Sequence, residues 1–332
     1  MKNKIAILIA LSFSVLTYSQ SIEKFSIDSG GASDTAGGIQ IVYTIGEVAV
    51  QESTVSGVSI SEGFINSSFR VSIDPKVFLQ GPLLNPTTAG LMNDDLRAGD
   101  YLPLTSPYGD GATVEDSVFD LGGTSGSGAA SDDIVDWIWL ELRDVNDNTI
   151  ATKGTSALLQ RDGDIVGLDG LATLIINTPP KNYFLVIKHR NHSGIMSSGT
   201  IGLSESTTTS IDFKNNGVST FGNQAQVQLV SSDMALWAGN VNGDDRIRYQ
   251  GSSNDSNAIK DLVIDNPGNT DNNNLFFYFA YDNADVNMDG RVRYQGSSND
   301  TNIIKDIIID HPANGDNNNL FFFTVQLPEN DN

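Results

Sequence analysis

The sequence DVNMDGRVRYQGSSND occupies positions 285–300, and a close copy, NVNGDDRIRYQGSSND, occupies positions 240–255. The similarity continues downstream: residues 240–277 and 285–322 align without a gap, and 27 of the 38 aligned positions are identical. Self-similarity at a fixed spacing of 45 residues indicates that one supersecondary unit is built twice. We therefore expect a paired-repeat module over residues 233–327, followed by a tail at 328–332.

The start of the second copy has the chemistry of a calcium loop. Asp285, Asn287 and Asp289 place oxygen-bearing side chains at alternate positions, and Gly290 follows them. Three such oxygens can converge on one ion while the glycine permits the sharp turn. The alternative is a solvated turn rich in Asn and Asp. Duplication of the pattern, with an acidic residue and an amphipathic segment after each copy, favours calcium.

A helix is predicted after each loop, at 257–265 and 302–310. The second helix carries one apolar stripe at helical spacing, formed by Ile303, Ile304, Ile307 and Ile308. Asp300, just upstream, is expected both to cap this helix and to bind the ion. Each repeat then ends in an amide-rich turn and an apolar strand or short helix, at 271–277 and 316–322.

These repeats resemble the dockerin-type calcium repeat. The resemblance covers residues 233–327 and implies ligands at equivalent positions of the two loops. In the second repeat they are Asp285, Asn287, Asp289, the main-chain carbonyl of Arg291, and Asp300. In the first repeat they are Asn240, Asn242, Asp244, the main-chain carbonyl of Arg246, and Asp255. The implied cofactors are two calcium ions.

Two departures from the dockerin pattern change these expectations. A twelve-position loop would close at Gly296, so both repeats need a four-residue insertion, within 294–298 in the second. This insertion alters the surface by which dockerins meet cohesins, so cohesin binding is not expected here. In the first repeat Asn240 replaces the opening aspartate and Asp245 replaces the turn glycine. We therefore expect the second site to bind calcium more tightly.

The N-terminus has the pattern of a signal peptide over residues 1–19. Lys2 and Lys4 precede an apolar run at 5–16, and the small residues Thr17 and Ser19 follow it. The run is shorter than the roughly 20 residues of a membrane span. The expected mature protein is secreted, extracellular or at the cell surface, with no transmembrane segment.

The composition bears on the classes of partner. The chain has 19 Lys and Arg against 41 Asp and Glu, a formal net charge of −22. Nucleic acid is not an expected partner, because phosphate binding depends on Lys and Arg. The acidic excess can hold cations, or can simply keep a secreted protein soluble. No cysteine is present, so metal is the natural substitute for disulfides in a small C-terminal module.

The rest of the chain is predicted to be mainly β. Residues 20–72 contain short apolar runs at 40–44, 47–50 and 57–60, typical of a short β-rich segment or a linker. Residues 73–232 are predicted to form an antiparallel β-sandwich domain. Its strand-like runs, separated by turn residues, are 77–79, 135–140, 157–159, 171–176, 183–187 and 227–230.

Three features of this domain could be functional or structural. Trp137 and Trp139 alternate along one strand and share a face, where they either stack on sugars or, as we expect, fill the core. His189 and His192 are an odd number of positions apart, so their rings should point to opposite faces of an extended chain, which argues against joint metal binding unless the chain bends there. We expect a loop or edge role for them instead of a metal or catalytic one. The alternating oxygens of 144–148 lack a following glycine and indicate a polar hairpin turn.

The segments 136–143, 161–164 and 189–192 together resemble, more loosely, a sandwich module of large surface and haemagglutinin-like proteins of gliding diderm bacteria. That resemblance implies no active site. We therefore expect a binding function, namely adhesion or attachment to a glycan or a protein partner.

One alternative is an accessory or catalytic component of extracellular polysaccharide degradation, in which a hydrolase would use two carboxylates. A purely structural matrix component is a third possibility. The chain has no nucleophile elbow, His-Glu zinc motif or phosphate loop, and no catalytic residue is assigned.

Overall fold

The computed structural model describes residues 31–36, 39–44, 51–55, 58–62, 69–120, 130–171 and 173–328. The chain divides into two compact units, residues 1–68 and 69–332. It is mainly β, as predicted. The predicted signal peptide and the run at 47–50 lie outside the described residues. Within the described part, no helix has the length and apolar character needed to cross a membrane.

The described residues of the N-terminal unit form two antiparallel strand pairs. β1 (Gly31–Ala36) pairs with β2 (Ile39–Thr44), and β3 (Gln51–Val55) pairs with β4 (Val58–Glu62). The apolar run predicted at 40–44 thus falls on β2, and residues 58–60 of the run at 57–60 fall on β4; Gly57 lies outside the described residues.

The largest sheet of the second unit is built around one long hairpin. β6 (Ile134–Arg143) lies between β7 (Ala151–Gln160) and β10 (Asn182–Lys188), antiparallel to both. Both faces of β6 are buried, which matches its nearly continuous apolar sequence. The turn at 144–150 joins β6 to β7, and Asp144 accepts a hydrogen bond from the N–H of Asn146 (2.9 Å), so the predicted polar hairpin is confirmed. Shorter strands complete the sheet: β8 (Ile165–Val166), β11 (Ile195–Met196) and β12 (Ile201–Gly202).

A second sheet has the order β13-β5-β9. Its central strand is β5 (Val71–Lys76), with β13 (Thr209–Asp212) and β9 (Leu174–Ile176) at its sides. β5 and β13 are parallel, contrary to the predicted wholly antiparallel arrangement. More than a hundred residues separate these two strands, which is ample for the crossover that a parallel pair requires.

The segment after β5 is largely irregular. The strand predicted at 77–79 is wrong, because β5 ends at Lys76 and the following amides bond to separate elements: Val77 N–H donates to Gly163 O (2.8 Å) and Gln80 N–H to Leu236 O (3.0 Å). Short helical turns follow, namely η1 (Gly81–Leu83), α2 (Asp95–Ala98), η2 (Asp116–Phe119) and η3 (Ala130–Asp132). A small antiparallel pair, β14 (Val227–Gln228) and β15 (Met234–Ala235), lies close to the module.

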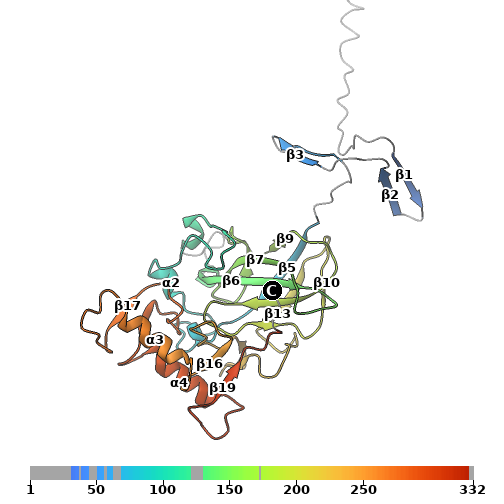
Figure 1. Cartoon of the computed structure of the whole chain (residues 1–332). Coiled ribbons are helices and arrows are strands. Elements are labelled where there is room, and N and C mark those ends of the chain that lie inside the picture. Colours follow the sequence, from blue (N-terminus) through green and yellow to red (C-terminus); the bar gives the residue numbers. More distant parts are fainter. Residues whose placement is uncertain are drawn as a thin grey trace, which may run out of the picture. The chain divides into compact units, whose positions relative to one another are not determined.

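The C-terminal module contains both predicted helices, α3 (Asp255–Ile264) and α4 (Asp300–Asp310), packed side by side (Figure 1). Each loop ends in a short strand, and each repeat ends in another. β16 (Arg246–Arg248) of the first loop pairs with β19 (Phe322–Thr324) at the end of the second repeat. β18 (Arg291–Arg293) of the second loop pairs with β17 (Phe277–Phe279) at the end of the first. The two repeats are therefore intertwined.

Buried apolar side chains form two clusters. One fills the β body, and the other lies in the module and includes Trp237, Ile259 and Ile304. The division between them falls close to the predicted boundary at 232. Met288, from the second loop, nevertheless belongs to the cluster of the body. The module and the β body together form one compact unit, residues 69–332.

Candidate metal centre and its buried polar network

The second loop is organised by its first residue. Asp285 is fully buried, and its two carboxylate oxygens accept hydrogen bonds from the N–H groups of Asp289 (3.1 Å) and Gly290 (2.8 Å). Asp289 in turn accepts from the N–H of Arg291 (2.9 Å) and from the side chain of Asn287 (3.1 Å). The structure thus brings Asp285, Asn287 and Asp289 together in one tight loop.

Asp300 closes this loop from the first turn of α4. Its two oxygens accept from the N–H groups of Val286 and Arg293, both at 2.8 Å. The expectation that Asp300 caps the helix is wrong: the N-cap is Asn299, whose side chain accepts from the N–H of Asn302 (2.8 Å). Because Asn299 satisfies the helix terminus, the Asp300 carboxylate remains directed at the loop.

The first loop repeats this closure but is more exposed. Asp255 accepts from the N–H groups of Val241 (2.8 Å) and Arg248 (2.8 Å), as Asp300 does in the second loop. Asn242 and Asp244 lie at the surface. Asn240 is 7% exposed, and its side-chain oxygen is buried without a hydrogen-bond partner. An unpaired buried acceptor is costly, and a bound cation would satisfy it.

At its tight turn, each loop has two residues in the left-handed backbone conformation. One of the two is a glycine, but the glycine occupies a different position in each loop. Gly243 and Asp245 have φ of +69° and +59°, whereas the equivalent Met288 and Gly290 have +60° and +79°. Asp245 therefore does place a side chain at the tight turn, as predicted. A Cβ on Gly290 would lie 2.7 Å from the Tyr101 ring, so the second loop also needs its glycine for close packing against the body.

The shared insertion has the same structure in both repeats. Gly251 and Gly296 each have φ of +108°. Their carbonyls accept from the side-chain amides of Asn254 and Asn299, both at 2.6 Å. Each insertion therefore leads directly into the N-cap of its helix and positions the following aspartate at the loop.

Burial makes the loop carboxylates costly to ionise. Desolvation raises the pKa of Asp285 to about 7, although the nearby Arg190 guanidinium opposes the shift. The pKa of Asp300 is raised well above its usual value by burial and then by the negative charge of Asp285. Burial also raises the pKa of Asp255 to about 7. A divalent cation at each loop would favour the ionised forms.

The donors present fit calcium, which prefers carboxylate, amide and main-chain oxygens. Among the described residues, no group of three or more His, Cys, Asp or Glu side chains meets the arrangement of a metal site. The predicted ligand sets also use asparagines and the carbonyls of Arg246 and Arg291, which lie at the starts of β16 and β18. Calcium at these loops therefore stays a prediction.

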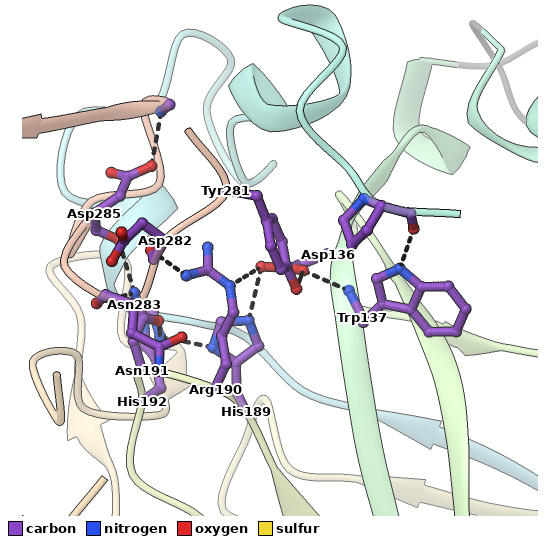
Figure 2. Close-up of polar contacts among 12 residues, drawn as sticks. Asp136, Trp137, His189, Arg190, Asn191, His192, Tyr281, Asp282, Asn283 and Asp285 are labelled. Atoms are coloured by element: carbon purple, nitrogen blue, oxygen red, sulfur yellow. Dashed lines mark hydrogen bonds and ion pairs between the residues drawn. The ribbon is translucent and has the colours of Figure 1, made fainter. Parts of the chain in front are cut away.

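A buried polar network fixes the second loop to the β body, and Figure 2 shows Arg190 at its centre. Arg190 donates to Asp136 (2.9 Å) and to the main-chain carbonyl of Asp282. Asn191 donates to the main-chain carbonyls of Asn283 (3.2 Å) and Asp285 (2.7 Å). These contacts hold the backbone of the loop at the residue that opens the candidate site.

Asp136 is the anion of this network. It also accepts from Tyr281 (2.7 Å) and contacts Nε2 of His189 (3.1 Å), as drawn in Figure 2. Burial alone would raise the pKa of Asp136, but Arg190 and His189 hold it at about 2. Sequence reasoning did not assign Asp136, Arg190 or Asn191 a role at the loop. A charged residue in the apolar run of β6 was the available signal.

The rings of His189 and His192 face each other, because the chain bends after β10, which is the exception to the opposite-face expectation. Their Nδ1 atoms lie 3.0 Å apart, and β10 ends at Lys188. His192 Nε2 accepts from the N–H of Gly81 (3.0 Å), and burial lowers the pKa of both histidines. The two histidines lie after the end of β10, in a loop as expected, and both are buried in the network.

The two tryptophans of β6 differ in burial. Trp137 is fully buried and donates to the Pro103 carbonyl (2.8 Å), which confirms the core interpretation. Trp139 is partly buried; it packs against Tyr108 and donates to Glu141 (3.1 Å).

Comparison of the chain with models of protein families, with curated proteins and with solved structures finds no match.

Proposed function

We propose that this chain is a secreted attachment protein of the cell surface or extracellular space, stabilised by a calcium ion in each C-terminal loop. Asp285, Asn287, Asp289, Asp300 and the Arg291 carbonyl would hold one ion. The equivalent residues of the first repeat, from Asn240 to Asp255, would hold the other. Each calcium ion would neutralise the carboxylates of its loop and hold the two ends of that loop together. It would have no free coordination position for catalysis.

The observation that carries the calcium proposal is the buried carboxylate pair of the second loop. Asp285 and Asp300 are 0% and 1% exposed; burial raises the pKa of both, and the negative charge of Asp285 raises that of Asp300 further. Like charges at such a site need a cation for ionisation to be tolerated. The unpaired oxygen of Asn240 at the equivalent position of the first loop supports the same chemistry.

The finer architecture belongs to the same proposal. The paired repeats would be a dockerin-like module with an altered partner surface, and cohesin binding is not part of the proposal. The sheets containing β5 and β6 would form a sandwich, since Ile73 of β5 and Trp137 of β6 lie in one apolar cluster. A rigid β body carrying a small module suits the presentation of a binding surface to a glycan or a protein.

Removal of calcium tests the site. Addition of a chelator should lower the melting temperature of the full chain, and Asp289→Ala should reduce the calcium-dependent increase more than Asp244→Ala. The two variants are matched, because each aspartate accepts one N–H two residues ahead, at 2.9 and 3.0 Å. The reason for the difference is that the second loop is buried and braced by Arg190. An identical melting curve with and without chelator would contradict the calcium proposal.

A glycan array, read with calcium and with chelator, tests the glycan form of attachment. Binding to a defined set of glycans would support it, and absence of binding under both conditions removes it and leaves a protein partner. Hydrolysis of a polysaccharide in a parallel screen would favour the alternative role in polysaccharide degradation.

A further inference from the structure

A groove of about 1060 Å³ lies where the second repeat meets the β body. One side is α4, and the other consists of two segments of the body: 83–90, and 224–234, which contains β14 and the start of β15. Apolar side chains line most of it, and three aspartates, Asp233, Asp306 and Asp310, lie among them. No part of the calcium loops lines this groove.

The groove lies on the α4 side of the module, although α3 and α4 are close in sequence. Ile307 of α4 lines the groove and is 4% exposed, whereas the equivalent Leu262 of α3 is 41% exposed. Ile303 also lines the groove, and its equivalent in α3 is Ala258. At the position of Ile307, α4 is covered, whereas α3 leaves its apolar side chain in water.

The body contributes apolar side chains that remain in water. Leu84 is 37% exposed, and Val230, in the turn between β14 and β15, is fully exposed. Both line the groove together with Ile303. Covering these side chains would release a favourable free energy roughly proportional to the apolar area buried. The groove thus favours a partner with an apolar face.

The charges of the groove are of one sign. Asp233, Asp306 and Asp310 line it, and no Lys, Arg or His does. None of the three aspartates forms an ion pair within the described part of the chain. The complementary partner therefore carries positive charge beside its apolar face.

A peptide suits this surface better than a glycan. Sugar recognition commonly uses an exposed aromatic ring, but the two aromatic residues of the groove, Phe78 and Trp237, are 5% and 3% exposed. The exposed lining consists of aliphatic side chains and carboxylates. Amphipathic peptide segments bind in grooves of this kind by an apolar face with fixed spacing.

We propose that the α4 groove binds a basic amphipathic segment of a partner protein. Its apolar residues would cover Leu84, Val230 and Ile303, and its Lys or Arg side chains would pair with Asp306 and Asp310. This inference names the partner chemistry of the proposed attachment function and rests on that function.

The test uses the full chain with calcium and a fluorescent amphipathic peptide made of leucine and lysine, followed by fluorescence anisotropy. The double variant Asp306→Asn/Asp310→Asn should weaken binding at least tenfold. The matched control is Asp261→Asn/Asp265→Asn, which changes the equivalent exposed positions of α3 and alters the net charge equally. Val230→Ser, at a fully exposed position, should weaken binding about threefold.

Several outcomes would overturn the groove proposal: no binding of the leucine–lysine peptide, equal weakening by both double variants, equal binding of a leucine–glutamate peptide, or displacement by an uncharged polysaccharide. The calcium proposal is tested separately, by the effect of chelator on the melting temperature. Calcium-dependent melting without peptide binding overturns the groove alone. Groove-specific peptide binding without any calcium effect overturns the calcium proposal alone.

Discussion

At the scale of single residues, the second loop combines buried carboxylic acids with one nearby positively charged side chain. Asp285 and Asp300 are buried together, and Arg190 is the guanidinium near them. Arg190 is already paired with Asp136, so it offsets only part of the charge of the loop. The folded chain without calcium should therefore prefer protonated acids at this site.

The calcium-dependent stability should consequently vary with pH. The pKa of Asp285 is raised to about 7 from an unfolded value near 3.9, so the folded state binds the proton more tightly. In chelator, the contribution of Asp285 to stability should be full at about pH 4 and should be lost as pH rises from about 4 to 7. Calcium should remove this loss, because it favours the ionised carboxylates.

Melting temperatures measured with calcium and with chelator at pH 5 and pH 8 check this prediction. The difference between the two conditions should be larger at pH 8. A difference that is equal at both pH values, or larger at pH 5, contradicts the assignment of buried acids as ligands.

Asp136 should be the most sensitive residue of the network. Asp136→Ala would remove the ion-pair partner of the buried Arg190 guanidinium, and we expect a loss of about 3–5 kcal/mol in the free energy of unfolding. Urea denaturation measures the loss, with the exposed Glu205→Gln as control, expected to change stability by less than about 0.5 kcal/mol. A loss below about 1 kcal/mol would show that Arg190 finds another partner.

At the scale of elements, the important feature is the exchange of strands between the repeats. β16 follows the first loop but pairs with β19 of the second repeat, and β18 of the second loop pairs with β17 of the first. The ring of Phe323 in β19 packs on the rings of Trp237 and His311, with centroid distances of 5.3 and 4.2 Å. The pairing of β16 with β19 is therefore anchored in the core of the module. Each loop is thus supported by the opposite repeat.

Substitution at one repeat should therefore act on the calcium site of the other. Phe323→Ala should weaken calcium binding at the first loop, and the equivalent Tyr278→Ala should weaken it at the second, each by about tenfold. Isothermal titration calorimetry of the full chain, with Asp244→Ala and Asp289→Ala used to identify the two sites, measures the effect. If each substitution weakened calcium binding only in the repeat that carries it, the strand exchange between the repeats would be contradicted.

At the scale of the whole molecule, the module is joined to the β body at several separate points. Met288 enters the core of the body, and Tyr281 and Arg190 meet at Asp136. The last described residues also return to the body, where Arg143 donates to the Pro328 carbonyl (3.0 Å). Loss of order at the second loop should therefore also destabilise the adjoining residues of the β body.

Hydrogen exchange should report this coupling. Removal of calcium should speed amide exchange in residues 186–196, which border the network, as well as in the loops themselves. Sheet residues remote from the network, such as β13, should change little. Faster exchange confined to residues 240–328 would show that the module opens independently of the body.

The sequence alone was sufficient for features that depend on local patterns. The mainly β class and the two helices followed from apolar periodicity, and the polar turn at 144–148 followed from its residue types. The equivalence of the two loops followed from duplication. These features could be predicted because backbone propensity and side-chain spacing act within a few residues.

Only the tertiary structure decided which distant groups meet. Arg190, Asp136 and Asp282 lie far apart along the chain, and their contact depends on how β6, β10 and the second loop pack. The parallel pairing of β5 with β13 and the exchange of strands between repeats are likewise long-range choices. Periodicity determines which side chains must be buried, but the partner that covers them is selected by the packing of the complete chain.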